Sequence, residues 1–280
     1  MAPEKTLKFS KMHGSGNDFI LIDNRNYIIS PKSASDLAIT ICQRKLGIGA
    51  DGLILIEPPT LEGSHFKWRF LNSDGSMADM CGNGGRCAAR FAFITGIAPE
   101  SMTFETGAGL ITAQILPEHR VKLKLPNPSN ISMDNELLIK NQKFTLHSIN
   151  TGVPHAICIT DTLNTVPVTE LGRTIRFHEN FQPEGTNVNF VCVQDKHTIK
   201  IRTYERGVED ETLACGTGSV AGAIITAIKG LTQSPVEVET QGGEKLKVYF
   251  NITGTDITEV FLEADTFLTY TGYLDGDLKV

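Results

Sequence analysis

The chain has 280 residues, of which 40% are apolar and 21% are charged, and its formal net charge is −6. This composition is ordinary for a globular protein with a hydrophobic core and excludes a disordered chain. The basic residues form no cluster along the sequence, which argues against a nucleic-acid partner. No apolar stretch approaches the ~18 residues that a membrane-spanning helix needs, so we also expect no membrane association.

Short strands dominate the predicted secondary structure, because most apolar runs are brief and are bounded by polar or glycine-containing segments. In chain order, the predicted strands are residues 19–23, 53–57, 66–71, 110–115, 121–125, 156–160, 188–193, 199–204, 246–250 and 259–262. Helices are predicted at residues 33–44, 86–95 and 219–229. Gly96 and Gly230 directly follow the last two helices, and a proline comes soon after each, which is an ordinary helix stop signal.

An internal repeat connects the two halves of the chain. Residues 81–109 and 215–243 align without a gap at a separation of 134, with nine identical pairs that begin with Cys81/Cys215 and end with Gly109/Gly243. In each copy a strand leads through a polar loop and a Cys-Gly-x-Gly turn into a small apolar helix, which we expect to be buried. The repeat predicts an α+β protein with two pseudo-symmetric domains, each a curved, mostly antiparallel sheet wrapped around a central helix.

Cys81 and Cys215 are the candidate catalytic residues. Both lie where a loop enters a predicted helix, whose first N–H groups are unpaired and carry partial positive charge. That setting stabilises a thiolate and lowers the pKa of a cysteine, and the adjacent glycines let a ligand approach the backbone. A carboxylate docked between two such helix ends would place its α-carbon between two sulfur atoms, one acting as base and the other as acid. The pattern therefore favours inversion of a stereocentre.

We expect the reaction to need neither a cofactor nor a metal. No lysine lies in a comparable motif for a pyridoxal Schiff base. The spacing of Cys81 and Cys87 does not fit a zinc site. Four cysteines are expected to be buried small side chains: Cys42, Cys87, Cys158 and Cys192. Six cysteines in a chain of this length, with no start resembling a signal peptide, indicate reduced thiols and a cytoplasmic location.

Several motifs along the chain match one known family. The segment Asn72-Ser73-Asp74-Gly75-Ser76-Met77-Ala78-Asp79-Met80-Cys81-Gly82-Asn83-Gly84-Gly85-Arg86 fits the signature N-x-D-G-S-x₄-C-G-N-G-x-R. Supporting motifs lie at residues 13–19, 47–52, 154–155, 185–190, 204–207 and 214–218. On these motifs, which span nearly the whole chain, the sequence resembles the diaminopimelate epimerase family, the cofactor-independent enzymes of bacterial and plant lysine biosynthesis.

The resemblance implies a reaction, a substrate and a set of site residues. Cys81 and Cys215 would act on opposite faces of one α-carbon to interconvert LL- and meso-diaminopimelate, a small amino acid. The domains would be residues 1–126 and 127–262, with residues 263–280 returning to the first. The reacting carboxylate would be held by Gly82, Asn83, Gly216 and Thr217. The pocket would be lined by Asn17, Asn72, Asn187, Glu205 and Arg206. His155 and Glu205 would tune the cysteine pair.

Two positions depart from the family pattern and leave alternatives open. Gly52 stands where glutamine is frequent, and Val153 stands where many members have an asparagine that binds the distal end of the substrate; Asn150 is a candidate to compensate. One alternative is a racemase of another amino acid on the same architecture. A second is a non-catalytic redox dithiol or anion-binding protein. A homodimer through a sheet edge is compatible with the pattern, but no residue indicates one.

Overall fold

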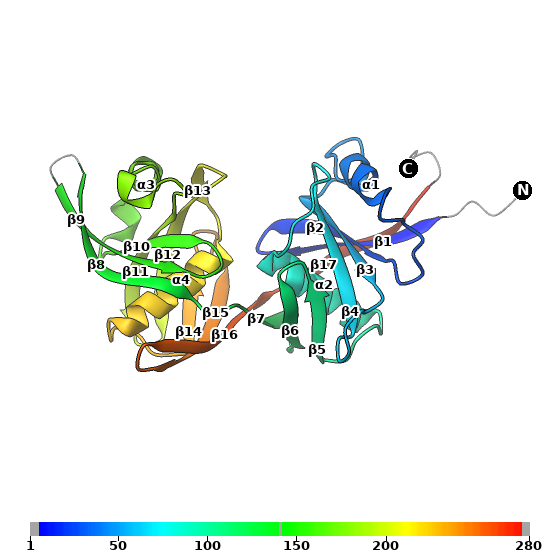
Figure 1. The fold of residues 1–280 in the computed structure, drawn as a ribbon. Helices are drawn as coiled ribbons and strands as arrows, with labels where there is room; N and C mark the ends of the chain where they lie inside the picture. Colours follow the sequence, from blue (N-terminus) through cyan, green and yellow to red (C-terminus); the bar gives the residue numbers. More distant parts are fainter. Residues whose placement is uncertain (1–5, 140–141, 276–280) are drawn as a thin grey trace, which may run out of the picture. The chain divides into compact units, whose positions relative to one another are not determined.

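The computed structural model describes residues 6–139 and 142–275 of the chain. These residues form two compact units, each with its own strands around one long helix (Figure 1). The first unit comprises the described residues up to Leu123 together with those from Ala264 onward, and the second comprises Lys124–Glu263. The chain therefore leaves the first unit once and returns to it at the end.

The first unit is a mixed sheet with two helices. Its elements are β1 (Leu7–Gly14), β2 (Asn17–Asp23), α1 (Ala34–Ile41), β3 (Gly52–Glu57), β4 (Phe66–Asn72), α2 (Gly82–Ile94), β5 (Ser101–Thr106), β6 (Gly109–Ile115), β7 (Arg120–Lys124) and β17 (Phe267–Leu274). Among the described residues, the strands pair in the order β17–β1–β2–β3–β4–β5–β6–β7. The pairs β2/β3 and β4/β5 are parallel, and the other pairs are antiparallel.

The second unit repeats this arrangement. Its elements are β8 (Ser129–Ile139), β9 (Gln142–Asn150), β10 (Pro154–Ile159), α3 (Val168–Arg176), β11 (Asn187–Asp195), β12 (Thr198–Glu205), β13 (Asp210–Thr212), α4 (Gly216–Ile228), β14 (Val236–Glu239), β15 (Lys245–Thr253) and β16 (Asp256–Asp265), with short 3₁₀ turns at Leu163–Thr165 and Glu179–Phe181. In the described part of this unit the order is β8–β9–β10–β11–β12–β14–β15–β16, with β10/β11 and β12/β14 parallel.

Each strand of the first unit thus has a counterpart in the second, and the parallel pairs fall at equivalent places. Helix α2 packs against β1, β2, β3 and β6, and α4 packs against β9, β10, β11, β12, β14 and β15. Mostly antiparallel strands around a central helix in each unit confirm the predicted α+β class.

Both faces of β2 and β3 are covered, which explains why these strands are continuous apolar runs. One face, with Ile20 and Leu53, joins a core cluster with Leu37 of α1. The opposite face carries Phe19 and Ile54, which lie next to the first turn of α2. A strand buried on both faces has no alternation of polar and apolar residues.

Helices α2 and α4 begin earlier than the sequence predicts, directly after Cys81 and Cys215. Glycine is a poor helix former, so propensity alone places the start beyond the glycines. The structure shows why glycine is present: a Cβ at Gly218 would lie 2.3 Å from Asn189 Oδ1, and one at Gly85 would lie 3.1 Å from Leu123 Cδ2. At Gly218 the first turn of α4 therefore packs too closely against β11 for a side chain to fit, and at Gly85 a side chain would press against Leu123, whereas Gly82 has open space around it.

Candidate active site

Cys81 is the residue that caps α2. Its backbone is extended, with φ −149° and ψ 120°, and its side chain lies over the first turn of the helix. The backbone N–H of Gly84 donates a hydrogen bond to Sγ at 3.4 Å, and the thiol donates to Asn17 Oδ1 at 3.5 Å. The thiol is half-buried. Cys81 therefore has a donor and an acceptor around one sulfur.

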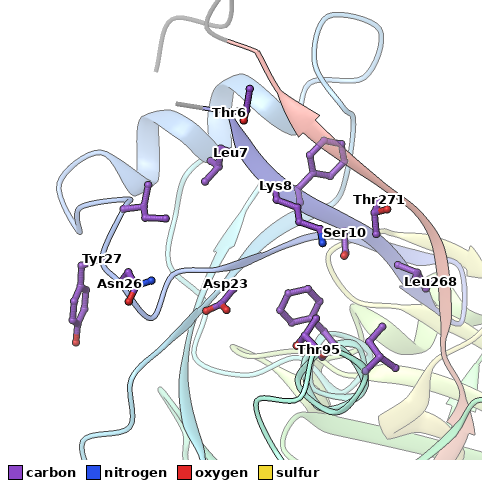
Figure 2. A pocket seen from close by; sticks show the side chains of 14 residues that line it. Thr6, Leu7, Lys8, Ser10, Asp23, Asn26, Tyr27, Thr95, Leu268 and Thr271 are labelled. Atoms are coloured by element: carbon purple, nitrogen blue, oxygen red, sulfur yellow. Dashed lines mark hydrogen bonds between the residues drawn. The ribbon is translucent and has the colours of Figure 1, made fainter. Parts of the chain in front are cut away.

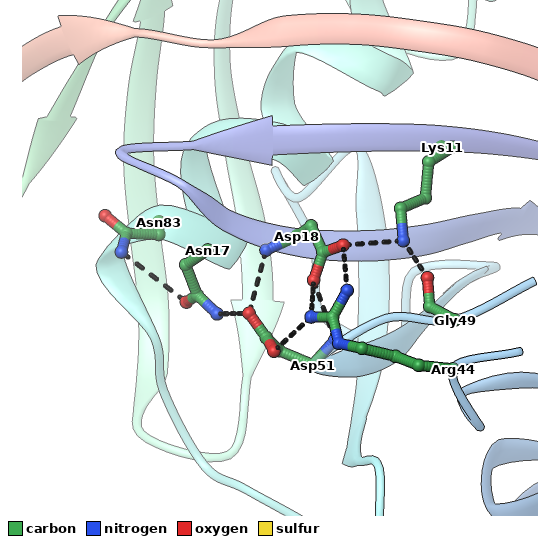
Figure 3. A network of polar contacts seen from close by, with 7 residues as sticks. All are labelled: Lys11, Asn17, Asp18, Arg44, Gly49, Asp51 and Asn83. Atoms are coloured by element: carbon green, nitrogen blue, oxygen red, sulfur yellow. Dashed lines mark hydrogen bonds and ion pairs between the residues drawn. The ribbon is translucent and has the colours of Figure 1, made fainter. Parts of the chain in front are cut away.

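Figure 3 shows a polar network that includes Asn17. Asn17 Nδ2 donates to Asp51 Oδ2 at 2.6 Å, and Asn83 Nδ2 donates to Asn17 Oδ1 at 3.5 Å. Arg44 binds Asp51 and Asp18 through the same guanidinium, with each shortest distance at 2.9 Å. The fold thus brings together three predicted site residues, Asn17, Cys81 and Asn83. Asn17 is hydrogen-bonded to Asp51, which is paired with Arg44, and the sequence predicted no role for either charged residue.

Arg86 supports the same turn from inside the unit. It lies on α2 and its side chain is fully buried. Its NH2 group donates to Asn83 Oδ1 and to Ser15 Oγ, both at 2.9 Å. A buried arginine is costly unless its donors are used, so these bonds are expected to hold Asn83 and the 13–19 segment in one arrangement.

Asn72 ends β4 opposite Gly52 of β3. Its side-chain amide donates to Ser76 Oγ at 3.0 Å within the turn that follows the strand. Gly52 has no space for a larger residue, since a Cβ there would lie 2.6 Å from Phe70 Cε2 and 2.7 Å from Leu71 O. The departure at residue 52 is therefore tied to how Phe70 packs in this chain.

Cys215 has the equivalent position at the start of α4. Its backbone is again extended, with φ −130° and ψ 110°, and the residue is buried. Its Sγ lies 3.6 Å from Thr217 Oγ1. Thr151 Oγ1 donates to Thr217 O at 3.0 Å, which ties the start of the helix to the loop before β10. Ser15 and Thr151 occupy equivalent places in the repeat, and each hydroxyl bonds to the helix that follows the cysteine.

His155 lies on β10 and is fully buried. Asn189 Nδ2 lies 3.0 Å from His155 Nδ1 and donates to Ala156 O at 3.2 Å. A backbone carbonyl only accepts, so the amide NH₂ faces this side and Nδ1 of the imidazole accepts from it. The imidazole proton is therefore on Nε2, which has no hydrogen-bond partner among the described residues. Burial, with the charge of Arg206, lowers the pKa of His155 to about 3, so the ring is neutral.

Asn187 and Arg206 are joined through the backbone. Asn187 Oδ1 accepts from the N–H of Arg206 at 2.9 Å, and its Nδ2 donates to Pro154 O at 3.0 Å. The Arg206 guanidinium donates to Glu184 O at 3.0 Å. Asn150 accepts from Gly152 N at 2.9 Å, so its oxygen is used in a local turn beside Val153.

The structure corrects the expectation that the helix ends lower the pKa of both cysteines. Burial raises the pKa of Cys81, and the N–H groups of Gly84 and Asn83 oppose this without reversing it. Burial raises the pKa of Cys215 to about 11, and the charge of Glu205 adds to the effect. Burial also raises the pKa of Glu205 itself. Loss of hydration disfavours a thiolate more than one helix turn stabilises it. Both residues are thiols at neutral pH in this structure.

Cys42, Cys87, Cys158 and Cys192, expected to be buried, differ in exposure. Cys42 and Cys87 are buried as predicted, whereas Cys158 and Cys192 are half-buried. Burial raises the pKa of Cys158 to about 11.

Three residues that hold the site in place carried no predicted role: Asp51, Arg86 and Asn189. All three fall inside the motifs on which the resemblance rests. For Arg86 and Asn189, a polar residue inside an otherwise apolar helix or strand is the signal that could have found them. Asp51 has no such signal, because it lies in an exposed loop before β3.

A cavity of about 1050 Å³ lies elsewhere in the first unit, and Figure 2 shows its lining. It is bordered by β1, β17, the end of α2 and the loop that carries Tyr27. None of the predicted site residues lines it.

Within residues 6–139 and 142–275, no three His, Cys, Asp or Glu side chains are grouped so that they could hold a metal ion. No helix in the described part of the chain is long and apolar enough to span a bilayer.

Solved structures share this fold at low sequence identity. A phenazine biosynthesis protein of the PhzF family from Bacillus anthracis matches with a TM-score of 0.72 and 14% identity, over 96% of this chain and 99% of that chain. A hydroxyproline epimerase from Agrobacterium vitis matches with a TM-score of 0.69 and 14% identity, over 98% of this chain and 94% of that chain. The chain therefore has the two-domain fold that PhzF proteins share with amino-acid epimerases.

Sequence comparison narrows this class to one family. The family model for diaminopimelate epimerase matches residues 9–129 and 147–259. The diaminopimelate epimerase of Aquifex aeolicus is 46% identical over 280 residues, which cover 97% of this chain and 99% of that protein. The diaminopimelate epimerase of Archaeoglobus fulgidus is 42% identical over 249 residues, which cover 85% and 87%. The chain belongs to the diaminopimelate epimerase family and is an isomerase.

Proposed function

We propose that the protein interconverts LL- and meso-diaminopimelate, with Cys81 and Cys215 as the two acid–base groups on opposite faces of the α-carbon. One observation carries the proposal: in each unit a cysteine occupies the residue directly before the central helix, at the equivalent position of the repeat. An inversion needs one group that removes a proton and another that delivers one, and a duplicated cysteine supplies both from the same kind of residue.

The first turns of α2 and α4 supply the second requirement, a place for the reacting carboxylate. Gly82 and Asn83 in α2, and Gly216 and Thr217 in α4, are the first residues of each helix. N–H groups at such positions have no intrahelical partner and attract an anion. Fixed N–H dipoles that hold the carboxylate also stabilise the negative charge that develops when the α-proton leaves.

The raised pKa values fit this chemistry. A thiolate of high pKa is a stronger base than an ordinary cysteine thiolate, although a smaller fraction of it exists at neutral pH. An amino-acid α-proton is very weakly acidic, so its removal depends more on the strength of the base than on the fraction of cysteine that is ionised. Neutral His155 and the carboxyl of Glu205 act as supporting groups: Glu205 raises the pKa of Cys215, and His155 offers its Nε2–H as a donor.

Arg206, Asn72 and Asn187 are proposed to recognise the distal end of the substrate. The Arg206 guanidinium is planar and can bind both oxygens of a carboxylate once it exchanges its bond to Glu184 O. Asn187 fixes the backbone N–H of Arg206 and so places the base of this side chain. The mechanism needs both thiols reduced, which supports a cytoplasmic location.

The direct test is an assay of the purified protein with LL-diaminopimelate and a panel of other amino acids, including proline. We expect meso-diaminopimelate as product, and we expect Cys81→Ala and Cys215→Ala each to lower kcat by about 100- to 10,000-fold, the usual loss of a general acid or base. Cys158→Ala is the matched control, because Cys158 is half-buried and has no proposed role; it should keep the wild-type rate. Faster turnover of another amino acid, or full activity without either candidate cysteine, would contradict the proposal.

A further inference from the structure

We propose that Asp51 is a positioning residue: it fixes the side-chain amide of Asn17 so that the amide oxygen faces Cys81 and holds that cysteine in its thiol form. The inference rests on the proposed function only in that Cys81 is an acid–base group. The arrangement itself can be tested in the resting protein, without substrate.

The orientation of Asn17 follows from which groups can donate. Asn17 Nδ2 lies 2.6 Å from Asp51 Oδ2. An ionised carboxylate only accepts hydrogen bonds, so the NH₂ end of the amide must face Asp51. The amide oxygen is then on the opposite side, where it accepts from the Cys81 thiol at 3.5 Å and from Asn83 Nδ2 at 3.5 Å. Rotating the amide by half a turn would place its oxygen against the carboxylate.

Asp51 is itself held by two further donors (Figure 3). The backbone N–H of Asp18 donates to Asp51 Oδ2 at 3.0 Å, and Arg44 NH2 donates to Oδ1 at 2.9 Å. Arg44 also pairs with Asp18, which is bonded in turn by Lys11 at 2.7 Å. The carboxylate that orients Asn17 therefore has both oxygens occupied and little freedom to turn.

The side-chain amide of Asn83, which donates to Asn17, is in turn oriented by the positive charge of Arg86. Arg86 NH2 donates to Asn83 Oδ1 at 2.9 Å, and a guanidinium only donates, so the NH₂ end of Asn83 must face away from it. That end points to Asn17 Oδ1. Asp51 thus orients the amide of Asn17 and Arg86 orients the amide of Asn83. Both interactions favour the arrangement in which the Asn17 oxygen lies beside the Cys81 sulfur.

An acceptor beside sulfur favours S–H over S⁻, because a thiol can donate to it and a thiolate is repelled by it. The charged and titratable groups around Cys81 act in both directions. Besides burial, which raises the pKa of Cys81 most, the charge of Asp51 raises it and that of Arg86 lowers it, while Cys87, six residues further along the chain, is a neutral thiol. Asp51 therefore has two effects of the same sign, one through Asn17 and one through its own charge.

The test is the pH dependence of alkylation at Cys81 in the full-length protein. Iodoacetamide reacts with the thiolate, so the rate at the Cys81 peptide, followed by mass spectrometry, reports the midpoint of its ionisation. Asp51→Asn removes the charge and allows the Asn17 amide to turn its NH₂ toward sulfur. We expect the midpoint to fall by about one pH unit or more, a shift within the usual range for a nearby charge.

Two matched controls accompany this variant. Asp23→Asn makes the same change at an aspartate of the same unit that is bound by Arg25; it should leave the midpoint at Cys81 unchanged. Cys158, in the other unit, is measured in the same samples and should not shift. An unchanged midpoint in Asp51→Asn, or an equal shift in Asp23→Asn, would overturn the proposal.

A second variant separates the two effects of Asp51. Asn17→Ala removes the acceptor and should itself lower the Cys81 midpoint. If Asp51 acts through Asn17, then Asp51→Asn will have a smaller effect in the Asn17→Ala background than in the wild type; an equal effect in both would mean that only its charge acts, and would overturn the positioning role. If Asp51→Asn does not fold, Asn17→Ala alone carries the test, and an unchanged midpoint contradicts it. A protein inactive on diaminopimelate would refute the proposed function and leave these expectations standing.

Discussion

Residue surroundings make the two cysteines unequal, although they occupy equivalent positions. Cys81 has the oxygen of Asn17 and the N–H of Gly84 around its sulfur. Cys215 has the hydroxyl of Thr217 and, nearby, the carboxyl of Glu205. A reversible two-base reaction needs equal capability and not equal surroundings, since each thiol must serve as acid in one direction and base in the other.

Buried neutral His155 gives the protein a pH-dependent stability that can be measured. Burial, with the charge of Arg206, lowers its pKa to about 3, whereas an unfolded histidine titrates near ~6.5. Below ~6.5 the unfolded chain binds a proton that the folded chain does not, so the free energy of unfolding falls as the pH drops toward 3. Between about pH 7 and 5 this single group accounts for a loss of about 2 kcal/mol.

His155→Asn should remove that part of the slope. Urea unfolding at the two pH values measures it, and the quantity compared is the difference between them, so any general loss of stability cancels. His178→Asn, in the same unit, is the control and should keep the wild-type slope. A His155→Asn protein whose stability falls with acid as steeply as the wild type would show that the ring is not buried in its neutral form.

What the sequence reveals at this scale depends on repetition. Cys81 and Cys215 could be found because each recurs in the same glycine context. Asp51 and Asn189 could not be assigned a role, because their partners Asn17 and His155 lie 34 residues away in each case and only the folded sheet brings them together. The prediction that the pKa of both cysteines is lowered was wrong for a related reason. The start of a helix can be predicted from a sequence, but the burial that raises the pKa of these cysteines cannot.

Helices and strands could be predicted where the local sequence carries a clear apolar pattern, and were missed where it does not. The predicted strands at residues 66–71 and 199–204 correspond to β4 and β12, and the predicted helices correspond to α1, α2 and α4. The residues alone did not predict the helix α3 or seven of the strands: β1, β5, β8, β9, β13, β14 and β17. Strand β8, for example, is mostly exposed and therefore lacks the apolar pattern that marks a buried strand.

The first turns of the central helices supply a prediction at the scale of the element. Gly218→Ala would place a Cβ 2.3 Å from Asn189 Oδ1, so Asn189 must move and give up its bonds to Thr203 and His155. We expect a loss of about 1–3 kcal/mol, the usual cost of overpacking. Gly82→Ala is the matched control, since a Cβ there meets nothing within 4 Å. Thermal unfolding of both variants makes the comparison, and equal melting temperatures would contradict this account of the glycine.

The whole molecule is best understood as one unit made twice. Each strand pair of the first unit, including the parallel pairs β2/β3 and β4/β5, has its equivalent in the second. The sequence repeat predicted two similar halves of the α+β class, and the structure confirms this class. It did not predict from the residues alone that β17 pairs with β1, because strands from opposite ends of the chain carry no mark of their partner. The repeat places a cysteine directly before the central helix of each unit, and hence provides two sulfur atoms.

The central claim is that two different cysteines act on one α-carbon, and hydrogen exchange with solvent tests it most directly. The protein is incubated with LL-diaminopimelate in D₂O, and the first meso product is examined by mass spectrometry and NMR. If one cysteine removes the α-proton and the other delivers a proton from its own thiol, already exchanged with solvent, the earliest product carries deuterium at the inverted centre. Product that retains its original protium from the first turnovers would show that a single base returns the proton it removed, and would contradict the two-cysteine account.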